Sequence, residues 1–265
     1  MMTGKGTNSY LVGSKNLVVI DPGPDDPDHV GKLAELSAGR LEYILVTHHH
    51  PDHAPGAVRL AAMTGAPILS FGAVPESPFA TVIPDRALAD GDVIAVTGLS
   101  LTALHTPGHT SDHLSFMANF GEGKGAPRVL FSGDTVIGGS TVVVAPPDGD
   151  MVAYMSSLER MLQLSPSADV IAPGHGELIE DPVEAINDYL ARRRARELSV
   201  LDALASGPST AAGLVASIYP DLFRGLDGVA TRTVWAHLRK LGSEGRAYSA
   251  APDDLNAQWS VARRN

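Results

Sequence analysis

The chain has no cysteine, which excludes both disulfide bonds and metal sites built from thiolates. It has no apolar run near the roughly 18 residues that span a bilayer. No basic segment followed by an apolar stretch of signal-peptide length opens it either. We therefore expect a cytoplasmic protein with no membrane partner. Its 265 residues, 44% of them hydrophobic, suffice for one large domain or for a medium domain plus a small one.

Basic residues are scarce in the first part of the chain. Residues 1–191 contain 9 Lys+Arg and 23 Asp+Glu, a net charge of −14, whereas residues 192–265 contain 11 and 7, a net charge of +4. The two values sum to the −10 of the whole chain. Such a split indicates two units with different partners, or two solvated surfaces of different origin.

Short apolar runs typical of strands alternate with helical patterns up to about residue 204. Strands are predicted over residues 8–12, 17–20, 41–46, 66–70, 93–97, 101–105, 114–118, 129–132 and 170–173. Helices are predicted over residues 29–38, 55–63, 151–164 and 182–204. Strands in pairs that then mix with helices suit two packed sheets with helices outside them, which is an α/β class.

The pattern changes after Gly207-Pro208. Two helices are predicted over residues 209–217 and 229–244, followed by short strands over 246–248 and 258–261. Helices followed by a hairpin are typical of a winged helix. We therefore divide the chain into a catalytic domain, residues 1–191, and a winged-helix-like C-terminal domain, residues 192–265.

The clearest chemical signal is the run from His48 to His53, directly after a predicted strand. It reads His-His-His-Pro-Asp-His, which has the form H-x-H-x-D-H. Alternate residues of an extended chain point the same way, so His48 and His50 can converge on one ion. The chain then turns into a helix, which directs Asp52 and His53 to a neighbouring point. Four ligands split in this way suit a pair of adjacent metals.

Three further candidate ligands each follow a predicted strand, at a place where several strand ends can meet in one cleft. His109 lies in a Thr-Pro-Gly-His-Thr run, Asp134 in Phe-Ser-Gly-Asp-Thr, and His175 in Ala-Pro-Gly-His-Gly. Imidazole and carboxylate groups suit zinc, and manganese or iron can bind the same donors. The sequence therefore predicts two metal ions, with zinc as the first choice.

The remaining histidines have structural interpretations. His29 and His237 lie in helical patterns and are expected at the surface. His105 is expected to pack below the site, and His49 fills the variable slot between two ligands.

The ordered set of ligands resembles that of the metallo-β-lactamase superfamily, and the resemblance covers residues 1–190. It implies a four-layer αββα fold for this part of the chain. It also implies which residues bind which metal. His48, His50 and His109 would bind the first metal; Asp52, His53 and His175 would bind the second; and Asp134 would bridge both.

The resemblance implies a metal-dependent hydrolase. Two cations about 3.5–4 Å apart would hold a hydroxide that attacks a carbonyl carbon or a phosphorus. Asp52 is the candidate for orienting this nucleophile. His113 follows a ligand closely and is the candidate for touching substrate or donating a proton, with a structural role as its alternative. Asp21, at the end of an early strand, is a candidate for holding a ligand histidine.

A narrower resemblance links the chain to the beta-lactamase-like protein 2 family. It rests on the run Gly6-Thr-Asn-Ser-Tyr, the run Thr106-Pro-Gly-His-Thr-Ser-Asp-His and the winged-helix-like unit. Members of that family include an endoribonuclease that acts on single-stranded RNA, so RNA is one candidate substrate. A basic track formed by Arg192, Arg193, Arg194 and Arg196 would lead RNA past the acidic first domain. The alternative is that these arginines pair with acidic residues across the contact between the two domains.

The alternative is a thioesterase or lactonase acting on small molecules, with the C-terminal domain as a lid or a dimer contact. A homodimer is compatible with the sequence. Hydrolysis of β-lactams is expected only as a weak side activity. A DNA-binding sensor ranks last, because the predicted helix over residues 229–244 contains few basic residues.

Overall fold

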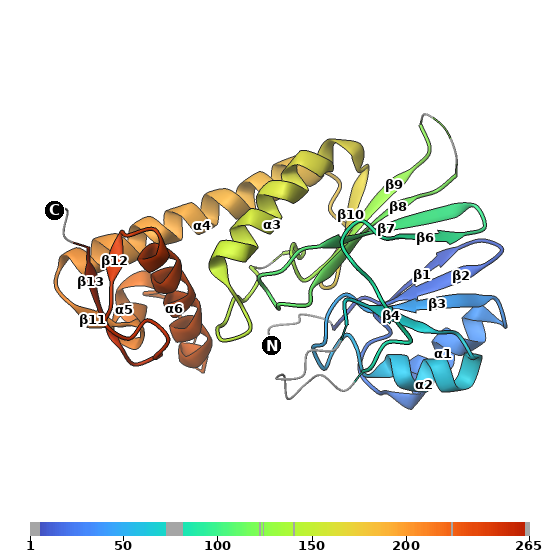
Figure 1. Ribbon diagram of the computed structural model, residues 1–265, viewed down its shortest axis with the longest axis horizontal. Coiled ribbons are helices and arrows are strands. Elements are labelled where there is room, and N and C mark those ends of the chain that lie inside the picture. Colours follow the sequence, from blue (N-terminus) through green and yellow to red (C-terminus); the bar gives the residue numbers. More distant parts are fainter. Residues whose placement is uncertain are drawn as a thin grey trace.

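Two five-stranded sheets face each other and carry helices on their outer sides (Figure 1). The structure, a computed structural model, describes residues 6–72, 82–121, 123, 125–139, 141–223 and 225–262. The first sheet, called sheet one, contains in spatial order β1 (Tyr10–Gly13), β2 (Leu17–Ile20), β3 (Leu41–Leu45), β4 (Ile68–Ser70) and β5 (Arg86–Ala87). Sheet two contains β10 (Val170–Pro173), β9 (Arg128–Gly133), β8 (Leu114–Asn119), β7 (Leu99–His105) and β6 (Val93–Val96).

The two sheets differ in strand direction. In sheet one only β1 and β2 are antiparallel, and β2 to β5 run parallel to one another. In sheet two β6 to β9 are antiparallel, whereas β10 joins β9 in parallel. Parallel strands need crossover connections, and helices supply them. Three of these connections contain helices: α1 (Pro27–Ser37) between β2 and β3, α2 (Gly56–Thr64) between β3 and β4, and α3 (Met151–Leu164) with the 3-10 turn η1 (Ser165–Ser167) between β9 and β10. Helix α4 (Pro182–Ala205) follows β10 and packs beside α3.

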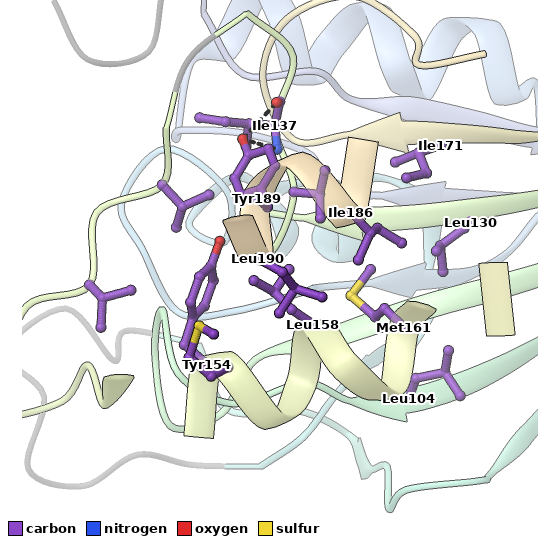
Figure 2. Packing of buried hydrophobic residues seen from close by; sticks show 14 of the residues in the cluster. Leu104, Leu130, Ile137, Tyr154, Leu158, Met161, Ile171, Ile186, Tyr189 and Leu190 are labelled. Carbon is purple, nitrogen blue, oxygen red and sulfur yellow. Dashed lines mark hydrogen bonds between the residues drawn. The ribbon is translucent and has the colours of Figure 1, made fainter. Parts of the chain in front are cut away.

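Buried apolar clusters separate the layers. Ile20 and Leu45 of sheet one meet Leu101 and Phe116 of sheet two in the space between the sheets, and each is at most 1% exposed. On the outer face of sheet one a second cluster packs against α1 and α2. On the outer face of sheet two a third cluster packs against α3 and α4 (Figure 2). The four-layer αββα arrangement expected from the sequence is therefore confirmed.

The C-terminal unit is a small helical domain with its own sheet. It contains β11 (Ser209–Thr210), α5 (Ala211–Ile218), α6 (Asp227–Ser243), β12 (Ala247–Tyr248) and β13 (Gln258–Val261), with strand order β11-β13-β12. Thr210 caps α5 by accepting a hydrogen bond from the Gly213 amide at 3.1 Å. Trp259, 1% exposed, fills the core of the unit together with Val234 and Leu238. This arrangement agrees with the predicted winged helix.

Helix α4 belongs to both parts of the chain. Ile186 and Tyr189 on its first half lie in the cluster against sheet two, whereas Val200 and Leu204 lie in the core of the C-terminal unit. The predicted domain boundary, between residues 191 and 192, lies inside this helix. Because the helix is continuous across it, the two parts are joined by a rigid element.

The structure adds elements that the sequence did not indicate. Strands β5 and β11 have only two residues each, too few for a periodic pattern, and their pairing with β4 and β13 defines them.

His237 is completely buried in α6, so the expectation of a surface position was wrong. Its neighbours Val234 and Leu238 are buried too, so this part of the helix presents a wide face to the interior. Among the described residues, no helix is both long and apolar enough to cross a membrane.

The contacts of Arg193 give a test of how the two parts are held together. Its guanidinium is buried, donates to the backbone oxygen of Val142 and lies 5.0 Å from the centre of the Tyr154 ring. Replacing Arg193 by Met should lower the free energy of unfolding by about 2–3 kcal/mol, because a charged hydrogen bond and a stacking contact are lost. Arg192→Met is the matched control on the same helix, since the Arg192 side chain is 68% exposed, and it should change stability by less than about 0.5 kcal/mol. Denaturant unfolding of both variants would measure this, and equal effects would contradict the assignment.

Candidate metal centre

All seven predicted ligands lie on loops that leave the ends of strands. The run from His48 to His53 follows β3, and the other three follow β7, β9 and β10. The loops from both sheets meet, so residues up to 123 positions apart in the sequence come within contact distance, as Asp52 and His175 do. The residues brought together are His48, His50, Asp52, His53, His109, Asp134 and His175. The fold thus assembles one polar cluster from four separate loops.

The first group consists of His48, His50 and His109, and is called the first cluster. His48 Nε2 lies 3.0 Å from His50 Nδ1, and His109 Nε2 lies 3.0 Å from the same atom. All three nitrogens lie within 4.8 Å of one another, which suits a common ion. The structure therefore brings together the three residues that the resemblance implied for the first metal.

The second group, called the second cluster, consists of Asp52, His53 and His175. His175 Nε2 lies 3.3 Å from both His53 Nε2 and Asp52 Oδ2. Asp134 lies between the clusters: its Oδ2 is 3.6 Å from His109 Nε2 and 3.3 Å from His175 Nε2. Its position matches the bridging role that the resemblance implied.

Outer hydrogen bonds fix which ring nitrogen faces each cluster. Nδ1 of His53 donates to Asp21 Oδ2 at 2.8 Å, as expected for an aspartate that holds a ligand histidine. Nδ1 of His109 donates to the Val143 oxygen at 2.7 Å. His48 and His175 are held through Nδ1 in the same way, by Thr47 Oγ1 at 2.9 Å and the Gly6 oxygen at 3.0 Å. In all four rings Nε2 therefore faces the site, where it can present a lone pair to a metal.

The seven side chains fit a pair of cations. Imidazole lone pairs and carboxylate oxygens both carry negative charge density, so they repel one another unless positive charge lies between them. Asp134 Oδ1 is buried and has no hydrogen-bond partner among the described residues. Such an atom is costly to bury unless an ion or a proton satisfies it. The His and Asp clusters can therefore hold a dimetal site.

The pKa values of the histidines differ between the first cluster and the second cluster. Burial, aided by neighbouring imidazoles, lowers the pKa of His50 to about 3 and that of His48 well below its usual value, so both rings stay neutral and can bind a metal. Burial also lowers the pKa of His175, but hydrogen bonds to Asp134 and Asp52 outweigh it and raise this pKa to about 10. Positive charge is thus strongly favoured at the second cluster.

His113 lies behind the cluster rather than in it. Its ring is completely buried, and its Nε2 accepts a hydrogen bond from the backbone amide of Asp134 at 3.0 Å. Its Nδ1 lies 2.9 Å from Thr106 Oγ1 and 3.2 Å from Thr135 Oγ1. Since both nitrogens are engaged, the geometry favours positioning of Asp134; the catalytic role of His113 stays a prediction.

His49 is buried beside the ligands and links three loops. Its Nδ1 lies 2.9 Å from Asp112 Oδ1, and its Nε2 lies 3.6 Å from Asp148 Oδ2. Asp148 also accepts a hydrogen bond from the Ser111 amide at 3.0 Å. His49 therefore ties the run that follows β3 to the loops near His109, and among the described residues it belongs to neither cluster.

The glycine before each of two ligand histidines is required by close packing. A Cβ on Gly108 would overlap the Tyr154 backbone, and one on Gly174 would overlap Asp134 Oδ1 and come within 2.8 Å of His53 Cε1. The Pro-Gly-His runs therefore have a physical reason, since only glycine lets these loops pass so close to the cluster.

Gly174→Ala should weaken metal binding by at least about 10-fold, because the added methyl group displaces Asp134 or His53 from its position. Gly31→Ala is the matched control: a Cβ there meets no atom within 4 Å, and alanine favours the α1 helix. Competition with a metal chelator would measure the affinity of both variants. Wild-type affinity in Gly174→Ala would show that the glycine is not required.

Comparison with known proteins finds a matching family for each of the two parts of the chain. Residues 2–175 match the family described as the metallo-beta-lactamase superfamily, and residues 210–259 match the beta-lactamase associated winged helix domain. A beta-lactamase-like protein 2 homolog of Drosophila melanogaster is 33% identical over 92% of this chain and 85% of its own length. An atrochrysone carboxyl ACP thioesterase of Aspergillus fumigatus is 32% identical over 81% of this chain and 69% of its own length.

Solved structures show the same fold along nearly the whole chain. A beta-lactamase domain protein from Burkholderia ambifaria superimposes with a TM-score of 0.79 at 22% identity, covering 97% of this chain and 87% of that one. A metallo-beta-lactamase family protein from Thermus thermophilus gives 0.75 at 24% identity, covering 96% and 93%. With its cluster of ligands, its four layers and these matches, the chain belongs to the metallo-β-lactamase superfamily of hydrolases and carries the associated winged helix domain.

Proposed function

We propose that this protein is a two-zinc hydrolase that cleaves small ester-type substrates, thioesters above all. The observation that carries the proposal is the convergence of seven acceptor side chains, with Asp134 between two groups of three. Zinc prefers this mixture of imidazole and carboxylate ligands at four to five positions. Manganese and iron accept the same donors and are the alternatives.

Two zinc ions held by these residues would lower the pKa of a water molecule and polarise the bond to be cleaved. The protein's own groups provide the rest. Asp52 is the part of the second cluster that reaches the solvent, with 36% of its side chain exposed, so it is placed to orient water and accept its proton. His113 holds the backbone of Asp134, and Asp21 holds His53, so the surrounding ligands keep their positions as charge develops.

The thioester substrate is supported by a relative and by charge. The Aspergillus fumigatus relative named as an ACP thioesterase aligns with most of this chain. Residues 1–191, which contain all seven ligands, have 9 basic and 23 acidic side chains, and such an excess of negative charge repels a polyanion. A small acyl thioester meets a weaker barrier.

Single-stranded RNA is the alternative substrate, and the proposed basic track is its main support. Two of its arginines are turned inward: Arg193 is buried, and Arg196 donates to the Ile218 oxygen at 2.6 Å while lying over the Tyr219 ring. Arg194 pairs with Glu159 at 3.1 Å. The side chains of Arg192 and Arg194 remain 68% and 61% exposed, so a reduced track is still present.

The test is a panel of an acyl thioester, a lactone, single-stranded RNA and a β-lactam, offered to the zinc-loaded protein. We expect the thioester or lactone to be turned over fastest, and the β-lactam slowly. Asp52→Ala and His53→Ala should each lower turnover by more than about 100-fold. Loss of a ligand should cost more than loss of a residue that only orients one, for which the decrease is about 10- to 100-fold. Asp202→Ala, at an exposed position of α4, is the control and should retain full activity.

RNA as the fastest substrate, with cleavage that falls steeply as salt rises, would overturn the thioester proposal in favour of a nuclease. Turnover by Asp52→Ala at the wild-type rate would remove that residue from the catalytic machinery.

A separate experiment tests the C-terminal domain, which we propose as a lid or a dimer contact. Residues 206–265 are deleted, and the turnover of the same substrates is compared with that of the full chain.

A further inference from the structure

The start of the described chain lies along the loop that carries His175. This N-terminal segment, residues 6–10, leads into β1 of sheet one but is hydrogen-bonded to the end of sheet two. The Asn8 amide donates to the Gly174 oxygen at 2.8 Å. The Asn8 side chain donates to the Pro173 oxygen at 3.0 Å and the Gly176 oxygen at 2.8 Å. Asn8 therefore fastens the segment to both sides of the ligand.

Two neighbouring residues of the segment contact the second cluster itself. The Gly6 oxygen accepts the hydrogen bond from His175 Nδ1 at 3.0 Å. The Thr7 hydroxyl donates to Asp52 Oδ2 at 3.1 Å, and this is the same oxygen that lies 3.3 Å from His175 Nε2. One short stretch of chain thus orients two of the three ligands.

Asp52 depends on such a contact more than its neighbours do. Its side chain is 36% exposed, against 12% for Asp134 and 7% for His175, so packing restrains it less. A carboxylate without an anchor samples several rotamers, and ordering it on metal binding costs conformational entropy. The Thr7 hydroxyl removes part of that cost in advance.

The first cluster is anchored elsewhere. His48 is held by Thr47 and His109 by the Val143 oxygen, and neither contact involves the N-terminal segment. A change confined to Thr7 therefore acts on one cluster and leaves the other as it is.

We propose that Thr7 is a positioning residue of the second cluster, and that through it the N-terminal segment sets the affinity of this cluster for its metal. The inference rests on the two-metal part of the proposed function. It gives a physical role to the Gly-Thr-Asn-Ser-Tyr run, which the sequence marked only as a feature shared with relatives.

The experiment is a zinc titration of the metal-free protein against a competing chelator, which resolves two binding steps. Thr7→Val keeps the shape of the side chain and removes the hydroxyl. It should weaken one step by about 10- to 100-fold and leave the other at its wild-type value. Thr7→Ser restores the hydroxyl and should restore the affinity. Ser9→Ala is the matched control in the same segment, because the Ser9 hydroxyl lies 2.9 Å from His29 Nε2 instead.

A second variant shows which binding step belongs to the second cluster. In His50→Ala only the second cluster is complete, so adding Thr7→Val to this variant should weaken its remaining zinc-binding step by the same factor. Thermal unfolding of the metal-free variants should match the wild type, which excludes a general loss of structure.

The inference is overturned if Thr7→Val binds both zinc ions with wild-type affinity, if both steps weaken equally, or if Thr7→Ser is as weak as Thr7→Val. These outcomes presuppose that the wild type binds two equivalents. A wild type that binds only one would overturn the two-metal proposal and this inference with it, so the two failures can be told apart.

Discussion

The site is governed by repulsion among acceptor groups. Five imidazoles and two carboxylates converge, and in four of the imidazoles an outer hydrogen bond at Nδ1 turns Nε2 towards the other groups. Without positive charge between them this arrangement is unfavourable, so the folded chain must hold the groups in place and also attract cations. The raised pKa of His175 reflects the same demand, because in the absence of a metal its hydrogen bonds to Asp134 and Asp52 favour a proton there, against the effect of burial.

The fold meets this requirement by holding most of the candidate ligands from behind. The two sheets pack through an apolar core, which fixes the separation of the loops at their ends. Asp21, at the end of β2, reaches across to His53, and Val143 supports His109 from the loop before α3. The C-terminal domain contributes as well: Arg193 of α4 and Arg232 of α6 donate to oxygens of that same loop, at Val142 and Pro146. The winged helix domain thus helps to support one of the metal-binding loops.

The residues that the sequence singled out do gather in one place, whereas the groups around them were harder to predict. The run from His48 to His53 could be predicted as a group of ligands, because H-x-H-x-D-H after a strand has few other interpretations. The four layers were predicted from the resemblance and from apolar runs long enough to show a period. The supports of the ligands were harder to find. Val143 and Gly6 act through backbone oxygens, which any residue type supplies, and Thr7 is far from Asp52 in sequence. His237 was placed at the surface because the spacing of apolar residues in its helix does not show how wide a face of that helix is buried.

The central claim is that the cluster is built for two cations, and metal content measures it most directly. Elemental analysis of protein expressed in zinc-replete medium, set against protein concentration, should give close to two equivalents of metal per chain. Asp134→Ala should lower this value, because Asp134 lies between the clusters. The wild type should also unfold at a higher temperature with metal than after its removal, since a ligand that binds only the folded state stabilises it. A firm value of one equivalent, unchanged in Asp134→Ala, would contradict the account.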